Sequence, residues 1–284
     1  MAKDSIFQPA LEALAASPNG VFGPVSFQDY LRHHHLGRHD TAPSISIDHL
    51  EALPDSLRGA DVMVFRLGSA EQAKTTQFAL VRSGGPVGDF FLIDSEIYTE
   101  RVGSTYLPSV SMRHLFAFQV LPDLTETSLV NLAIASGVLS EAIGIDGGKI
   151  PAAPARTQST FSFGFRAHSN LPDTLMHRNG QVEVDAVFVE NRNGKACLFV
   201  VEAKQGLGPP SLAKHKLVYP ILAIARKVPR DMEIVPIYLR AFRGDDGIHF
   251  KIAECSFPDP RCGDSAINEL QAVKTTYRVL PLWR

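Results

Sequence analysis

The chain has 284 residues, carries a formal net charge of −2 and is 45% hydrophobic and 20% charged. This balance is typical of a globular protein, and it excludes a strongly basic chain that binds nucleic acid through overall charge alone. No stretch reaches the roughly 20 apolar residues of a membrane helix, and the first residues contain no apolar block of signal-peptide length. We therefore expect a cytoplasmic protein without membrane contacts. The three cysteines form no C-x-x-C pair, so neither a disulfide framework nor a zinc knuckle is indicated.

The first part of the chain, residues 1–120, is expected to form a small α+β domain. Ser26 is a suitable N-cap for a short helix predicted over 26–34. Runs rich in β-formers, separated by glycine and proline, predict strands over 61–67, 77–82 and 89–94. We expect this domain to contribute substrate recognition or homodimer contacts.

The second part, residues 121–284, predicts a mixed β-sheet flanked by helices, an α/β or α+β fold. Apolar residues at helical spacing predict a helix over 127–143 and another over 211–227, which Pro220 should kink or split. Strands are predicted over 160–166, 181–190, 196–204, 233–240 and 248–253.

Asn193 and Gly194 stand between two of these predicted strands. An Asn-Gly pair in this position favours a two-residue type I′ turn, because both central residues of that turn take positive φ. The turn fixes the strand register, so that Arg192 faces Lys195 and the pairing can be counted back along both strands.

This register places charged side chains together on one face of the hairpin. Asp185 falls opposite Glu202, and Glu183 falls opposite Lys204. Two carboxylates that face each other across a sheet repel, and a divalent cation between them removes the conflict. Oxygen ligands favour Mg²⁺ or Mn²⁺, and such an ion with a nearby lysine is suited to phosphodiester hydrolysis. The alternative is a plain cross-strand ion pair between Glu183 and Lys204 on a solvated face.

The order strand-Asp185, hairpin, strand-Glu202-Ala203-Lys204, helix resembles the PD-(D/E)XK nuclease superfamily, the restriction-endonuclease-like fold. The resemblance covers about residues 124–255 and implies that Asp185 and Glu202 bind Mg²⁺ while Lys204 assists the attacking water. It also implies that the main-chain carbonyl of Ala203 is a further metal ligand. Val184 replaces the proline of the motif, and this position varies in such families.

Many members of that superfamily place an acidic residue on the first helix. The candidates here are Glu126 and Glu141, and we prefer Glu126 as a fourth catalytic residue. Alternatively, Glu126 stabilises the helix by interacting with the helix dipole from the first turn.

The resemblance implies a Mg²⁺-dependent (or Mn²⁺-dependent) endonuclease that hydrolyses DNA, such as a restriction or defence enzyme. Two alternatives stay open. One is a binding module for nucleic acid or protein that keeps the fold without turnover, and the other is a structure-selective repair nuclease.

Other polar residues near the motif have weaker signals. Gln205 is a minor candidate, and Arg240 and Arg243 are expected on the surface, with phosphate contact as the alternative. The helix after the motif carries side chains expected on a solvated face, namely Lys214, His215, Lys216 and Tyr219. The alternative that the resemblance implies is that one of them contacts the scissile phosphate.

Overall fold

The structure is a computed structural model that describes residues 3–70, 73–150, 152–263 and 265–282. The α-helices are α1 (Gln8–Ala15), α2 (Phe27–His33), α3 (Thr41–Ile45), α4 (Asp55–Gly59), α5 (Asp94–Ile97), α6 (Met112–Val120), α7 (Glu126–Ser136), α8 (Val138–Ile143) and α9 (His215–Ala225). The strands are β1 (Val21–Ser26), β2 (Val62–Ala70), β3 (Ala73–Arg82), β4 (Phe91–Ile93), β5 (Ser104–Thr105), β6 (Ala155–Arg166), β7 (Thr174–Arg192), β8 (Lys195–Gln205), β9 (Ser211–Ala213), β10 (Glu233–Arg243), β11 (Gly247–Ser256) and β12 (Gln271–Pro281). Within these ranges no helix is long and apolar enough to cross a membrane.

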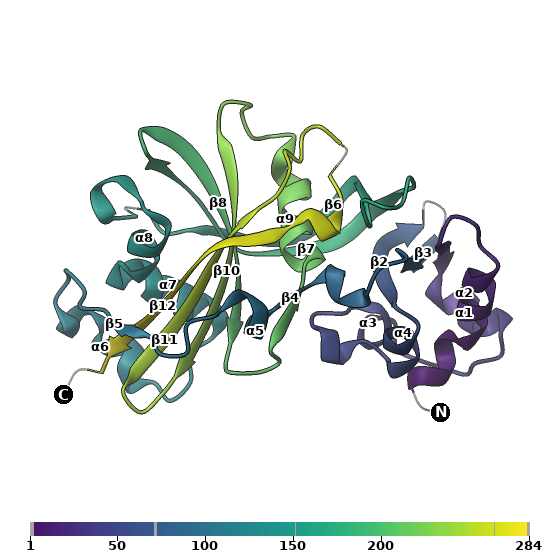
Figure 1. Cartoon of the computed structure of the whole chain (residues 1–284), viewed down its shortest axis with the longest axis horizontal. Coiled ribbons are helices and arrows are strands. Elements are labelled where there is room, and N and C mark those ends of the chain that lie inside the picture. Colours follow the sequence, from purple (N-terminus) through teal and green to yellow (C-terminus); the bar gives the residue numbers. More distant parts are fainter. Residues whose placement is uncertain (1–2, 71–72, 151, 264, 283–284) are drawn as a thin grey trace.

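The fold is α+β, as predicted, with a large mixed sheet flanked by helices (Figure 1). Its strand order is β1-β3-β2-β7-β8-β10-β11-β12-β5, and β6 pairs with β7. The β7–β8 pair is antiparallel and the β8–β10 pair is parallel, with α9 in the connection between the latter two. Helix, hairpin, helix and parallel strand therefore follow in the predicted order.

Alternate residues of β8 point into two different hydrophobic cores. Phe199 belongs to a core with α7 and α8, whereas Val200 belongs to a core with α9 and the N-terminal elements. Successive side chains of a strand point to opposite faces, so the helices cover the two faces of the sheet around the hairpin.

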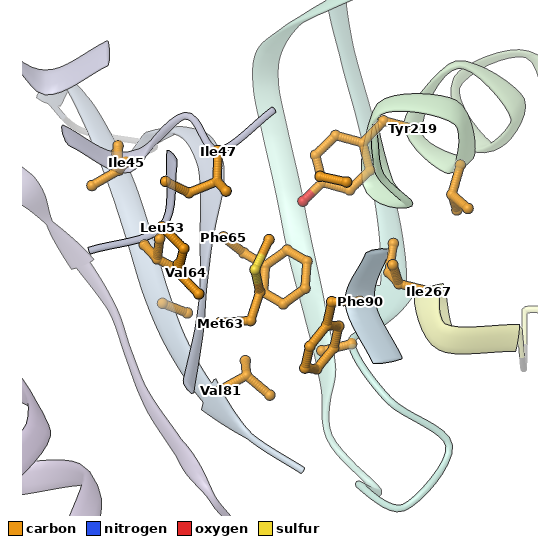
Figure 2. Packing of buried hydrophobic residues seen from close by; sticks show 14 of the residues in the cluster. Ile45, Ile47, Leu53, Met63, Val64, Phe65, Val81, Phe90, Tyr219 and Ile267 are labelled. Atoms are coloured by element: carbon orange, nitrogen blue, oxygen red, sulfur yellow. The ribbon is translucent and has the colours of Figure 1, made fainter. Parts of the chain in front are cut away.

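The N-terminal helices α1–α4 gather at one end of the molecule around β2 and β3, and the long β7 reaches toward them (Figure 1). Gly68 of β2 pairs with Arg178 of β7, and its φ of +80° and close approach to the Arg178 carbonyl leave no room for a side chain. Phe65, Phe90 and Tyr219 lie in one cluster that draws on both predicted domains (Figure 2). The domain boundary near residue 120 stays a prediction.

Several predicted elements are confirmed with shifted ends. Ser26 caps α2 by accepting the N–H of Asp29 at 3.3 Å, as expected. The strand predicted over 160–166 begins at Ala155, and the one predicted over 181–190 is the much longer β7. The strand predicted over 89–94 is shorter, because only Phe91–Ile93 is extended.

Two helix predictions are wrong in part. The helix predicted over 127–143 breaks at Gly137, whose φ of 87° is a left-handed helix cap, so that α7 and α8 are separate. The first residues of the segment 211–227 form β9, which pairs with β4, and the helix begins only at His215. Pro220 lies inside α9 without splitting it.

Candidate active site

The predicted hairpin turn is confirmed. Asn193 and Gly194 have φ of 55° and 73°, and the β7–β8 ladder pairs Arg192 with Lys195. Asp146 accepts the N–H groups of Asn193 and Gly194 at 3.0 and 2.8 Å, which fixes the turn from outside the hairpin. The register deduced from the sequence holds along the whole ladder.

The ladder ends at the pair Ala186–Val201, earlier than predicted. Asp185 is therefore not a ladder partner of Glu202. Its carboxylate Oδ2 instead accepts the N–H of Ala203 at 2.8 Å, a donor that a continued ladder would direct to the main chain of β7. The expected pair of Glu183 with Lys204 is wrong for the same reason, because the ladder ends before it; on its other edge β7 pairs Glu183 with Gln158 of β6.

The structure nevertheless brings the four predicted side chains together. Glu202 is 3% exposed, and Lys204 Nζ lies 2.8 Å from its Oε1. Glu126, in the first turn of α7, lies with Oε1 at 3.6 Å from the same ammonium. Asp185 is close enough for its charge to act on both Glu202 and Lys204. We call Glu126, Asp185, Glu202 and Lys204 the carboxylate–lysine cluster.

Glu141, the alternative acid on the first helical segment, lies elsewhere. Its carboxylate Oε1 pairs with Nη2 of Arg278 on β12 at 2.9 Å. The position of Glu126 therefore agrees with the choice made from the sequence.

Burial and charge set the protonation of the cluster. Burial raises the pKa of Glu202 to about 7, the negative charge of Asp185 adds to the effect, and Lys204 opposes it. Burial disfavours the charged form of Lys204, but the adjacent Glu202 outweighs this and raises the pKa of Lys204 above its usual value. The cluster thus holds more carboxylate than its ammonium neutralises.

Lys216 was expected on a solvated helical face, and that expectation is wrong. Its Nζ lies 3.3 Å from Oδ1 of Asp48, and its charge also acts on Glu202. Tyr219 on the same helix and Lys214, the residue that precedes the helix, are 7% and 8% exposed. The sequence of α9 is apolar on nearly all sides, which indicates a buried helix. The burial of its polar side chains could therefore have been predicted from the sequence.

Arg240 is likewise not a surface residue. It is 2% exposed, and its Nε lies 2.5 Å from Oδ2 of Asp94. It also donates to the carbonyls of Gly206 and Pro209 at 3.0 and 2.6 Å. Arg240 therefore holds the loop that follows Lys204.

The cluster suits Mg²⁺ or Mn²⁺ in the chemistry of its donors. The described residues contain no group of three or more His, Cys, Asp and Glu arranged to hold a metal ion. Mg²⁺ is commonly held by one or two carboxylates and keeps several waters, which Asp185 and Glu202 can satisfy. The charge conflict between these two carboxylates is what a bound cation would relieve.

A family model described as a domain of unknown function (DUF6997) matches residues 101–276, which is more than half of the chain. The chain belongs to this family. The matched DUF6997 region contains the whole carboxylate–lysine cluster and α9, and its description assigns no activity. No curated protein and no solved structure matches the chain.

Proposed function

We propose that this DUF6997 protein is a Mg²⁺- or Mn²⁺-dependent endonuclease that hydrolyses DNA at the carboxylate–lysine cluster. One observation carries the proposal: Glu202 is a buried carboxylate that shares its surroundings with Asp185 and has Lys204 at 2.8 Å. A structural ion pair needs one acid and one base, whereas this cluster places the three carboxylates of Glu126, Asp185 and Glu202 around one ammonium.

Each residue has a distinct role in this proposal. Asp185 and Glu202 would hold the cation, with the Ala203 carbonyl as the further ligand that the PD-(D/E)XK resemblance implies. When bound, the ion polarises a phosphoryl oxygen and lowers the pKa of a coordinated water. Lys204 would orient the attacking water and would offset the negative charge that develops at the phosphate. Glu126, at 3.6 Å, keeps the Lys204 ammonium directed into the cluster.

A second candidate is a nucleic-acid- or protein-binding module that has kept the fold without turnover. It is favoured by the Lys204 bond that already satisfies Glu202. Metal titration separates the two candidates, because only the nuclease is stabilised by binding of Mg²⁺ or Mn²⁺.

The direct test is incubation of plasmid and oligonucleotide DNA with Mg²⁺, Mn²⁺ or a chelator. We expect metal-dependent cleavage by the wild type and at least a roughly hundredfold slower reaction for Lys204→Ala, with DNA binding retained. Lys195→Ala, at an exposed lysine beside the hairpin turn, is the matched control and should cleave normally.

Absence of cleavage on linear, branched, methylated and unmethylated DNA would overturn the proposal. Cleavage confined to branched DNA would instead identify a structure-selective nuclease. Equal rates for Lys204→Ala and Lys195→Ala would show that the activity comes from another site.

A further inference from the structure

A pocket with several polar side chains lies where the first turn of α9 meets the N-terminal elements. Its volume is about 90 Å³, and its lining includes Ser46 and Arg66 from the N-terminal part together with His215, Lys216 and Tyr219 from α9. The residues that line it do not include Asp185, Glu202 or Lys204. The pocket is therefore distinct from the carboxylate–lysine cluster, although the Lys216 charge acts on Glu202 as well.

Four buried polar atoms of this lining have no hydrogen-bond partner within the described ranges. They are the hydroxyl of Tyr219, a residue that is 7% exposed, Nδ1 of His215 and the two ring nitrogens of His177. Figure 2 shows the Tyr219 side chain extending with its hydroxyl directed away from α9. Buried polar groups normally have partners, so these atoms indicate a ligand that supplies them.

The surrounding charges favour a negatively charged ligand. Arg66 and Lys216 bring two cations, and α9 directs the positive end of its dipole toward its first turn. The N-cap residue of α9 makes no side-chain capping bond in the described structure. Asp48 and Glu183 also line the pocket and equal the two cations in number, but both acids are exposed to solvent, whereas Arg66 and Lys216 are half-buried.

The polar groups of the lining match a small oxyanion. The hydroxyls of Ser46 and Tyr219 are donors of the kind that bind phosphate oxygens. Burial lowers the pKa of His215 to about 3, so its neutral ring offers one N–H and one acceptor.

We propose that this pocket binds a phosphate oxyanion through Arg66, Lys216 and the Tyr219 hydroxyl, next to the carboxylate–lysine cluster. The source would be a phosphate of the nucleic-acid strand near the scissile one, and this part rests on the proposed function. The proposal of an anion site in this pocket does not rest on the proposed function.

The test is titration of the whole chain with inorganic phosphate in the presence of a chelator. Calorimetry and thermal unfolding measure the binding. We expect roughly tenfold weaker phosphate binding in Arg66→Gln and in Tyr219→Phe, the loss typical of one hydrogen bond to a charged group. Tyr219→Phe removes only an unpartnered hydroxyl, so a purely structural role predicts unchanged binding. Arg58→Gln is the control, since Arg58 lies on α4 and pairs with Asp55. Non-specific salt stabilisation would act equally on all four proteins.

A second arm measures binding of a short single-stranded oligonucleotide under the same metal-free conditions. Weaker binding of both phosphate and oligonucleotide by the two variants supports the nucleic-acid source. Weaker binding of phosphate alone supports the oxyanion site but excludes the nucleic acid as its source. Wild-type protein that binds no phosphate, or variants that bind it like the control, would overturn the inference while leaving metal-dependent cleavage untouched.

Discussion

At Glu202 two physical effects act against each other on one carboxylate. Burial favours the protonated form and raises its pKa to about 7, whereas Lys204 at 2.8 Å favours the ionised form. In the metal-free protein this group destabilises the fold as pH rises from about 4.5 to about 7, because the unfolded chain releases the proton first. A bound divalent cation needs the ionised form and so reverses the preference.

The affinity for Mn²⁺ should therefore depend on pH. Below pH 7 one proton must leave Glu202 when the ion binds, so we expect the affinity to fall by up to about tenfold for each pH unit. Calorimetric titrations between pH 5.5 and 8.5, roughly the span in which a pKa near 7 is resolved, measure this. An affinity that does not change between pH 5.5 and 7 would rule out Glu202 as a ligand with this pKa.

Asp185→Asn separates the structural and metal roles of Asp185. The amide oxygen can still accept the N–H of Ala203, so the free energy of unfolding should change by less than about 1 kcal/mol. The negative charge is lost, so Mn²⁺ binding should weaken at least roughly tenfold. Denaturant unfolding and Mn²⁺ titration of the same variant measure both quantities. Unchanged Mn²⁺ affinity would exclude Asp185 from the site.

Among the elements, the hairpin was the most predictable from the sequence, because an Asn-Gly turn is a local feature that determines the register on both sides. The ends of strands were less predictable, since they depend on partners distant in the sequence. β7 extends back to Thr174 because β6 pairs with it, and β12 pairs with β11 although no strand was predicted there. The helix break at Gly137 could have been expected from the glycine, whereas the cluster's contact with Glu126 needed the tertiary packing of α7.

Gly194→Ala tests the turn that sets the register. The φ of 73° at Gly194 is costly for any residue with a Cβ, and no atom lies within 4 Å of the added methyl group. We expect a loss of about 1–2 kcal/mol in the free energy of unfolding, measured in urea. Gly59→Ala, at the end of α4 and equally uncrowded but without positive φ, should be neutral or slightly stabilising. Equal effects of the two substitutions would contradict this account.

In the whole molecule, buried polar contacts join the N-terminal elements to the sheet that carries the cluster. Asp94 of α5 lies 2.5 Å from Arg240 of β10, and Tyr238 donates to the same carboxylate at 3.1 Å. The sequence alone could not pair residues so far apart. For this reason Arg240 was expected on the surface, whereas the burial of α9 could have been predicted from its apolar sequence.

Asp94→Ala should lower the free energy of unfolding by about 3–5 kcal/mol, because it leaves the 2%-exposed Arg240 without its counter-ion. Replacing the pair together, as Asp94→Leu with Arg240→Met, should cost less than Asp94→Ala. The exposed pair of Asp55 and Arg58 provides the control, with an expected change below about 1 kcal/mol for Asp55→Ala. Urea unfolding measures all three proteins. Equal losses for Asp94→Ala and Asp55→Ala would show that the buried pair does not couple these elements.

The central claim is that Asp185 and Glu202 hold one divalent cation beside Lys204. A crystal structure of the protein with Mn²⁺, with anomalous scattering recorded for the metal, tests it most directly. We predict one anomalous peak within about 2.0–2.3 Å of oxygens from both carboxylates, accompanied by ordered waters. Crystals grown with saturating Mn²⁺ that show no peak between these two side chains would contradict the account.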